Sequence, residues 1–274
     1  MPAPATHHQL VQLSDAHILA PGRLLDNRID TASALRAAVQ RVNDLQPAPL
    51  GVLLTGDLVD AGSPAAYAHL RQLLAPLTLP VWLMPGNHDE RGALRAAFPD
   101  HAYLHNQDTQ GFIQYTVDLP DLRLVALDTV VAGAGHGALC SHRLDWLDRT
   151  LRAAPYMPTL LAMHHPPFQT HIGHMDALGL LEGGDAFAEI VSRHRQIERI
   201  VCGHIHRSIQ CRVAHTVAMT VPSTAHQIAL DIGDSAGSYT LEPPGMSLHV
   251  WRSGPDLVTH LLPIGDFPGP FAFA

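Results

Sequence analysis

The sequence predicts an α/β fold with a β-rich C-terminal part. Over the first two thirds of the chain, apolar runs of strand length alternate with segments whose apolar residues recur at helical spacing. The last third contains mostly strand-like runs. The chain has 274 residues, of which 46% are apolar and 15% are charged. It is therefore long enough to bury a full core and has the composition of an ordinary soluble globular protein.

Strands and helices are expected to alternate in the first part of the chain. Strands are predicted at residues 9–14, 49–56 and 79–86, where apolar residues run together. A helix at residues 29–45 would place Leu35, Val39 and Val42 on one face. Ser63 is expected to cap a second helix, which Pro64 begins. A short third helix is expected at residues 89–98. This alternation indicates an α/β arrangement.

The remaining elements change from mixed helices and strands to strands alone. Strands at residues 114–119 and 122–128 are expected to be antiparallel neighbours, and a helix at 142–154 follows. Apolar runs at 159–165 and 199–206 enclose a helix at 185–194. Further strand-like runs lie at residues 208–213, 217–223, 225–230, 246–253 and 256–262. The Pro- and Gly-rich residues 263–274 are expected to be irregular.

The charge balance argues against binding to a nucleic acid polymer. The 17 basic and 25 acidic residues give a net charge of −8, with no block of like charges. No apolar stretch approaches the roughly 18 residues that a membrane helix needs, and the N-terminus lacks the features of a signal peptide. An odd number of cysteines fits reduced thiols. We therefore expect a cytoplasmic protein without a membrane partner, with free thiols at Cys202 and Cys211.

Five apolar runs end in side chains that can bind metals, and histidine is unusually frequent, with 20 copies. In open α/β sheets, ligands bind beyond the carboxyl ends of the strands, so the five clusters can converge on one site. Mixed imidazole and carboxylate ligands suit Mn, Fe or Zn. In chain order the clusters are Asp15 with His17, Asp57 with Asp60, Asn87 with His88 and Asp89, His164 with His165, and His204 with His206.

The stretches "SDAH", "GDLVD", "GNHD", "MHHPP" and "GHIH", in this order, resemble the five motifs of the calcineurin-like metallophosphoesterases. The resemblance implies a metallophosphoesterase four-layer α-β-β-α sandwich, with a catalytic core at residues 1–207 and a β-rich part at 208–274 that completes it. Residues 163–187 and 223–229 further resemble the bacterial branch that holds class III cyclic-nucleotide phosphodiesterases and glycerophosphodiesterases. Relatives in this branch form homo-oligomers, so we expect a dimer or larger assembly whose interface uses residues after about Arg207.

Carried over motif by motif, the resemblance implies two transition-metal ions (Mn, Fe or Zn, divalent or trivalent) that share Asp57. Two divalent ions, two aspartates and one bridging hydroxide leave a charge of about +1, which suits a singly charged diester. The implied reaction is attack of the bridging hydroxide on a small phosphodiester, such as a cyclic nucleotide like cAMP or a glycerophosphodiester. One ion would be bound by Asp15, His17, Asp57 and His206, and the other by Asp57, Asn87, His164 and His204.

Substrate contacts are expected beside the metals. We assign catalysis to Asp57 and His88, the second of which would contact phosphoryl oxygens or protonate the leaving alkoxide. Substrate binding is assigned to Asn87, His88, His226 and Arg91.

Several neighbouring residues keep two interpretations. Asp60 and Asp89 would either orient neighbouring groups through hydrogen bonds or be purely structural. His165 would either exchange with His164 as a ligand or support the ligands from behind. A substrate contact and a solvated loop both remain open for His171, His174 and Asp176.

The sequence can be compared with three alternatives to a diesterase. A phosphomonoesterase must balance a dianion and usually adds arginines around the metals, whereas only Arg91 and Arg207 lie close to the motifs in sequence. A nuclease would need a basic groove, which the acidic net charge disfavours. A non-catalytic scaffold is expected to have lost ligands, and none is missing here. A diesterase is therefore preferred.

Overall fold

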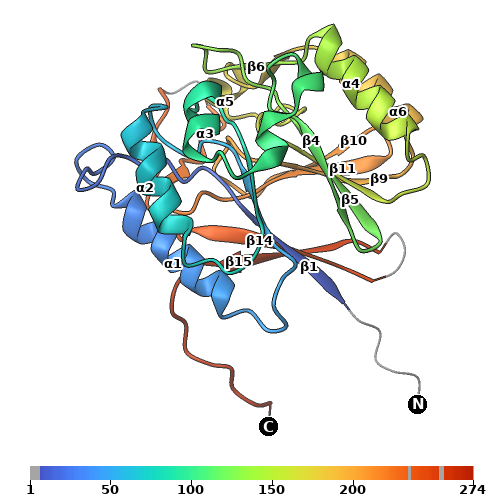
Figure 1. The fold of residues 1–274 in the computed structure, drawn as a ribbon. Helices are drawn as coiled ribbons and strands as arrows, with labels where there is room; N and C mark the ends of the chain where they lie inside the picture. Colours follow the sequence, from blue (N-terminus) through green and yellow to red (C-terminus); the bar gives the residue numbers. More distant parts are fainter. Residues whose placement is uncertain (1–6, 234–235, 253–255, 274) are drawn as a thin grey trace.

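The computed structural model describes residues 7–233, 236–252 and 256–273, and these residues form two large sheets with helices outside them. Figure 1 shows one group of helices beside the sheet that holds β1 and β14, and another beside the sheet that holds β5 and β9. The four-layer α-β-β-α sandwich expected from the sequence is thereby confirmed.

The first sheet has the strand order β15-β14-β1-β2-β3. Strands β1, β2 and β3 are parallel, whereas β14 is antiparallel to β1, and β15 to β14. The bounds are β1 His8–Leu13, β2 Val52–Thr55, β3 Val81–Met84, β14 Gly245–Trp251 and β15 Val258–Pro263.

The second sheet has the order β10-β11-β9-β7-β5-β4. Strands β5, β7, β9 and β11 are parallel, and β4 pairs antiparallel with β5, as the sequence predicts. The segment after residue 208 thus supplies strands to both sheets. The bounds are β4 Tyr115–Leu119, β5 Leu122–Leu127, β7 Thr159–Met163, β9 Ile197–Cys202, β10 Gln210–Val213 and β11 Thr216–Thr220, with short pairs β6 Gly137–Ala138 and β8 Leu180–Glu182, and β12 Gln227–Ile228 and β13 Tyr239–Thr240.

Helices α1 and α2 begin directly after side chains that cap them. Asp30 accepts a hydrogen bond from the Ser33 backbone N–H at the start of α1, and Ser63 accepts one from Ala66 before α2, which Pro64 begins. No helix in these described ranges is long and apolar enough to cross a membrane. The bounds are α1 Thr31–Asn43, α2 Pro64–Leu74, α3 Arg91–Ala97, α4 Ser141–Arg152, α5 Gly173–Asp176 and α6 Gly184–Arg193, with 3₁₀ turns η1 Ala102–His105 and η2 Gln107–Thr109.

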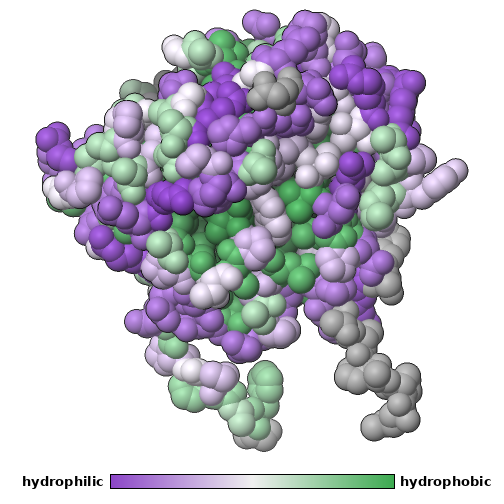
Figure 2. Space-filling view, in the orientation of Figure 1, coloured by the Kyte–Doolittle hydropathy of each residue, from purple (hydrophilic) through white to green (hydrophobic). Residues whose placement is uncertain are grey.

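Alternating residues of β5, β7 and β9 in the second sheet face two different hydrophobic layers. On β5, Leu124 and Ala126 pack in the cluster that includes the first sheet, α1 and α2, whereas Val125 and Leu127 pack with α4 and α6. The visible face of the molecule is hydrophilic around its periphery and has an apolar area in its middle (Figure 2). Burial on both faces fixes the register of each strand, and therefore the place where it ends.

Candidate metal centre

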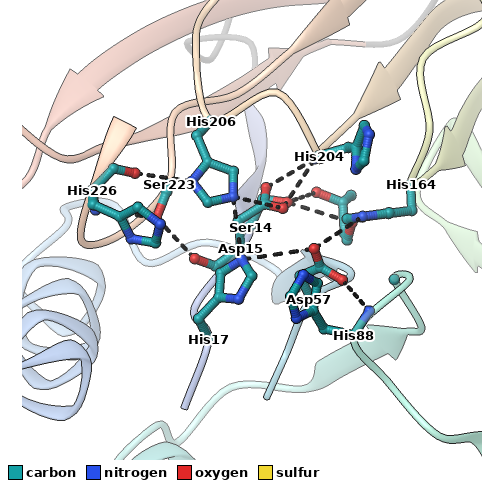
Figure 3. A network of polar contacts seen from close by, with 12 residues as sticks. Ser14, Asp15, His17, Asp57, His88, His164, His204, His206, Ser223 and His226 are labelled. Atoms are coloured by element: carbon teal, nitrogen blue, oxygen red, sulfur yellow. Dashed lines mark hydrogen bonds and ion pairs between the residues drawn. The ribbon is translucent and has the colours of Figure 1, made fainter. Parts of the chain in front are cut away.

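The carboxyl ends of five parallel strands, three from one sheet and two from the other, carry the predicted ligands. Asp15 follows β1, Asp57 follows β2 and Asn87 follows β3 in the first sheet. His164 follows β7 and His204 follows β9 in the second sheet. The side chains of Asp15, Asp57, His164 and His204 meet in one buried cluster, in which His17 and His206 also lie (Figure 3). The half-buried Asn87 contacts His164 and His204 through its amide oxygen.

Left-handed backbone conformations aim these side chains inward. Asp15, His17, Asp57, His204 and His206 have φ angles of 53°, 44°, 46°, 70° and 52°. Such conformations cost about 1–3 kcal/mol each for residues other than glycine, and they cluster at functional sites. Tight packing explains two neighbouring glycines, because a Cβ on Gly86 would overlap Asp57, and one on Gly203 would overlap Ser14. The surrounding fold therefore stabilises a strained arrangement of ligands.

The first group consists of Asp15, His17 and His206. His17 Nδ1 lies 3.3 Å from an Asp60 carboxylate oxygen, and His206 Nδ1 lies 3.0 Å from the carbonyl oxygen of His226. Both Nδ1 atoms therefore donate, which leaves a lone pair on each Nε2. The two Nε2 atoms are only 3.2 Å apart, and His206 Nε2 is 3.5 Å from an Asp15 oxygen. Facing lone pairs at this distance require a proton or a metal cation between them.

The second group consists of Asn87, His164 and His204. His164 Nδ1 donates to the Thr55 carbonyl oxygen at 2.7 Å, so its Nε2 faces the Asn87 amide oxygen at 3.1 Å. Burial lowers the pKa of His164, but the Asp57 charge outweighs it and raises the pKa to about 9, so without a metal this Nε2 carries a proton that a bound cation would replace. His204 Nδ1 lies 3.0 Å from the same amide oxygen, and its buried Nε2 has no hydrogen-bond partner. Burial, reinforced by His164, lowers the pKa of His204 to about 3, which keeps this imidazole neutral. Neutral imidazoles are the form that binds metals.

Asp57 lies between the two groups. One of its carboxylate oxygens accepts the backbone N–H of His88 at 2.9 Å. The other lies 3.7 Å from His17 Nε2 and 3.4 Å from His164 Nε2. Burial opposes ionisation of this carboxyl, but His164 and His17 hold its pKa well below the usual range. A single anionic oxygen is therefore placed to serve both groups.

The residues present fit bound metal ions. Each group offers imidazole nitrogens and carboxylate or amide oxygens, and the Nδ1 atoms of His17, His164 and His206 are fixed by hydrogen bonds, which is the arrangement typical of metal-binding histidines. The short Nε2 contact between His17 and His206 and the buried unpaired Nε2 of His204 are both polar features that the protein alone leaves unsatisfied.

His88 lies at the exposed side of the cluster. Its Nδ1 donates to the Asp60 carbonyl oxygen at 2.7 Å, so its Nε2 is the nitrogen left for a ligand. The side chain is 39% exposed, and its ring lies 4.7 Å from that of His17. Burial lowers the pKa of His88, but the Asp57 charge and the Asp60 contact outweigh it and raise the pKa overall. The position suits a residue that exchanges protons with a bound substrate.

His226 and Arg91, the other predicted substrate residues, differ in placement. The His226 ring lies 4.7 Å from His206 and 5.5 Å from His17, so it belongs to the wall of the cluster. Arg91 forms a two-bond fork with the buried Asp128, at 2.7 and 2.8 Å, and also donates to the Val130 carbonyl. The Nε and one Nη nitrogen of Arg91 are thus engaged by acceptors of the protein itself.

Comparison with known proteins agrees with this geometry. Residues 8–208 match the family model described as calcineurin-like phosphoesterase. The chain belongs to this family. It is therefore an enzyme of phosphoester hydrolysis, as the five motifs predict.

Members of the family with similar sequences span most of the chain. One is named a probable glycerophosphodiester phosphodiesterase, from Arcobacter nitrofigilis, and is 33% identical over 96% of both chains. A probable cyclic nucleotide phosphodiesterase from Rhodopseudomonas palustris is 36% identical over 92% of this chain and 91% of the relative. A 3',5'-cyclic adenosine monophosphate phosphodiesterase from Pseudomonas aeruginosa is 34% identical over 80% and 77%. Among solved structures, a purple acid phosphatase from yellow lupin shares the fold, with a TM-score of 0.68 at 12% identity over 95% of this chain and 52% of its own.

Of the residues left open by the sequence, Asp60, Asp89, His165 and Asp176 make side-chain hydrogen bonds within the protein, and those of Asp89 reach the N–H groups of Leu58 and Gly86. Asp176 accepts from the Thr170 N–H, the Thr170 hydroxyl and the His171 N–H at 2.7–2.9 Å, which fixes the loop before α5. His165 is fully buried and contacts the Thr129 hydroxyl at 2.8 Å and the Gly135 carbonyl at 3.2 Å. Both ring nitrogens of His165 therefore have partners, although its ring lies 4.6 Å from that of His204. Asp60, as noted, orients His17.

Two supporting residues were not found by sequence reasoning. The Ser223 hydroxyl donates to the Asp15 carbonyl at 2.8 Å, and the Thr55 carbonyl orients His164. Ser223 follows β11, so it shares the strand-end position of the five clusters and could have been singled out on that ground. The role of the Thr55 carbonyl has no sequence signal, because every residue has one.

Proposed function

We propose that the chain hydrolyses small phosphodiesters, either 3',5'-cyclic nucleotides or glycerophosphodiesters, at a centre of two transition-metal ions. The observation that carries this proposal is the Asp57 oxygen between His17 and His164, at 3.7 and 3.4 Å. A shared carboxylate is the feature that distinguishes a paired centre from two unrelated sites. The names of the relatives support the choice of a diester.

In this proposal Asp15, His17, Asp57 and His206 hold one ion, and Asp57, Asn87, His164 and His204 hold the other. The ions, when bound, would polarise the phosphoryl group and activate water as the nucleophile. Hydrogen bonds from His17 to Asp60, from His206 to His226 and from His164 to Thr55 keep the ligand nitrogens turned inward. His88 would donate a proton to the departing alkoxide through Nε2, while Asn87 and His226 would border the substrate.

A diester is preferred over a monoester because the nearby arginines are paired. Arg91 forms its fork with Asp128, and Arg207 donates to Glu242 and to the Ile228 carbonyl, both at 2.7 Å. A dianionic monoester would call for cationic donors near the metals, and pairing removes these two from that role. A singly charged diester needs less compensation.

The decisive experiment is a substrate panel on protein reconstituted separately with Mn, Fe and Zn. We expect kcat/KM for an aryl diester, cAMP or a glycerophosphodiester to exceed that for the matching monoesters. Higher kcat/KM for monoesters would favour a phosphomonoesterase, and metal binding without hydrolysis of any ester would favour a scaffold. Asp57→Asn, matched in size, is the control for hydrolysis that does not depend on the centre.

Two further expectations accompany the function. The cytoplasmic location follows from composition, and the homo-oligomer follows from the family resemblance; fractionation and light scattering at micromolar concentration would check them. Iron, manganese and zinc all suit the donor set, so elemental analysis of the protein as isolated would identify the native pair.

A further inference from the structure

A glutamine stands in the apolar layer between the two sheets. Gln12 lies on β1 and is fully buried, three residues before Asp15. The hydrophobic cluster that fills this layer joins residues of the first sheet to Leu160, Ala162 and Val201 of the second. A buried amide costs free energy unless its polar atoms are hydrogen-bonded, and a leucine would fill a similar space without that cost. The polar side chain at this position therefore calls for an explanation.

Both ends of the Gln12 amide have partners. Its Nε2 donates to the Thr55 hydroxyl oxygen at 3.0 Å and to the Cys202 carbonyl oxygen at 3.1 Å. A carbonyl can only accept, so the amide nitrogen and not the amide oxygen faces Cys202. His249 Nε2 donates to the amide oxygen at 3.2 Å, and His249 Nδ1 accepts from the Thr259 hydroxyl at 2.9 Å. His249 thus fixes which way the amide is turned.

The two acceptors of Gln12 stand at the ends of strands that lead into the metal centre. Thr55 ends β2, two residues before Asp57, and Cys202 ends β9, two residues before His204. The contact between Gln12 and Cys202 joins positions 190 residues apart, on different sheets. One amide therefore fastens β1 and β2 of the first sheet to β9 of the second, directly behind the residues that follow these strands.

The gap between the sheets at this end decides how the ligands are spaced. In the proposed centre each ion is bound by residues of both sheets, and paired ions of this kind lie roughly 3.5–4 Å apart. A change in the gap would therefore alter ligand distances at both ions. Two other contacts cross the gap here, from His164 Nδ1 to the Thr55 carbonyl at 2.7 Å and from the His204 N–H to an Asp15 oxygen at 3.0 Å. Both are made by the proposed ligands themselves, whereas Gln12 is not a ligand.

We propose that Gln12 is a positioning residue that sets the spacing of the two sheets, and hence of the two metal ions, from behind the centre. The inference rests on the proposed function, because it takes the centre of two ions as given. Gln12 acts through Thr55 and Cys202, and His249 acts through Gln12. Loss of the amide should therefore change the metal pair although every ligand is still present.

Gln12→Leu tests the proposal, because it keeps a similar volume and removes the amide. Its partners retain other contacts: the Thr55 hydroxyl donates to the Ser14 hydroxyl oxygen at 2.8 Å, and the Cys202 carbonyl accepts the Val221 N–H at 3.2 Å. We therefore expect the variant to fold. Its affinity for Mn²⁺, measured by equilibrium dialysis, should be about 10–100-fold lower than that of wild type. The exchange coupling between the two Mn²⁺ ions, measured by electron paramagnetic resonance, should also change, since it depends on their separation.

Gln196→Leu is the matched control. Gln196 is also a buried glutamine, its Nε2 donates to the Leu151 carbonyl at 2.9 Å, and it directly precedes β9, at the opposite end of that strand from His204. It should lose stability in urea, but its Mn²⁺ affinity and exchange coupling should equal those of wild type. Gln12→Met, which has an unbranched side chain of similar length, replaces Gln12→Leu if that variant does not fold. Adding His249→Leu to Gln12→Leu should lower the Mn²⁺ affinity no further, because His249 acts through the amide.

The outcomes separate this proposal from the proposed function. Wild-type Mn²⁺ affinity and exchange coupling in Gln12→Leu would overturn the positioning role and leave the centre of two ions standing. Equal changes in Gln12→Leu and Gln196→Leu would also overturn it, because they would reflect a general loss of stability. A wild-type protein that binds fewer than two Mn²⁺ ions per chain, or two ions without exchange coupling, would instead remove the paired centre, and the positioning role with it.

Discussion

Removal of the Asp89 carboxylate should separate two tightly joined strand-end loops. This buried side chain accepts the N–H of Gly86 at 2.8 Å, the N–H of Leu58 at 3.0 Å and the N–H of Val59 at 3.4 Å. It also accepts the Tyr67 hydroxyl at 2.7 Å. Asp89 thus ties the loop after β3, which holds Asn87, to the loop after β2, which holds Asp57.

The size of the effect follows from the donors that lose a partner. In Asp89→Ala, three short hydrogen bonds and one long one disappear, and each buried donor left unpaired costs about 1–3 kcal/mol. Water entering the space left by the carboxyl offsets part of this. We expect the free energy of unfolding to fall by about 3–5 kcal/mol. Asp89→Asn keeps one acceptor and should lose about half as much, and Tyr67→Phe, which removes a single hydroxyl, about 1–2 kcal/mol.

Urea denaturation of the metal-free proteins measures the three losses in the free energy of unfolding directly. The variants should also bind metal more weakly, and this is measured as metal content after gel filtration, at a temperature where circular dichroism shows every variant folded. Loss of such supporting contacts typically lowers metal affinity about 10–100-fold. An Asp89→Ala protein that unfolds within about 1 kcal/mol of wild type would show that the carboxylate does not hold the loops together.

Three other outcomes are expected. Asp57→Asn should lose both metal ions, measured by elemental analysis, and all hydrolytic activity. Retention of one full equivalent of metal per chain would argue against a shared ligand. His88→Ala should retain its metals and lose about 10²–10⁴-fold in kcat/KM on alkyl diesters but less on an aryl diester; equal losses would remove the general-acid role. Burial and Arg199 lower the pKa of His249 to about 3, so the contribution of this residue to the stability of the folded state is complete above pH 6.5 and declines as the pH falls toward 3. When the pH is lowered from 7 to 5, the free energy of unfolding should therefore fall by about 2 kcal/mol less in His249→Asn than in wild type. Urea titrations at both pH values measure this, and equal decreases in the two proteins would contradict it.

The elements of the fold follow from local patterns that the sequence carries openly. Ser63 and Pro64 mark the start of α2 because capping and a fixed proline φ act within one turn. The adjacent β4 and β5 pair antiparallel because a short connection permits no other arrangement. Residue 253, the last of the strand predicted at 246–253, lies outside the described ranges.

The sequence by itself determined which residue types stand at the strand ends and in what order, and hence the family. Only the tertiary structure decided that one Asp57 oxygen faces both His17 and His164, that Arg91 is held by Asp128, and that the Tyr115 hydroxyl reaches the backbone of β3. The hydrogen bond from His164 to Thr55 joins positions 109 residues apart. Such contacts depend on how the two sheets stack and on left-handed turns that side-chain patterns do not encode, because a local sequence constrains its own backbone far more than its distant partners.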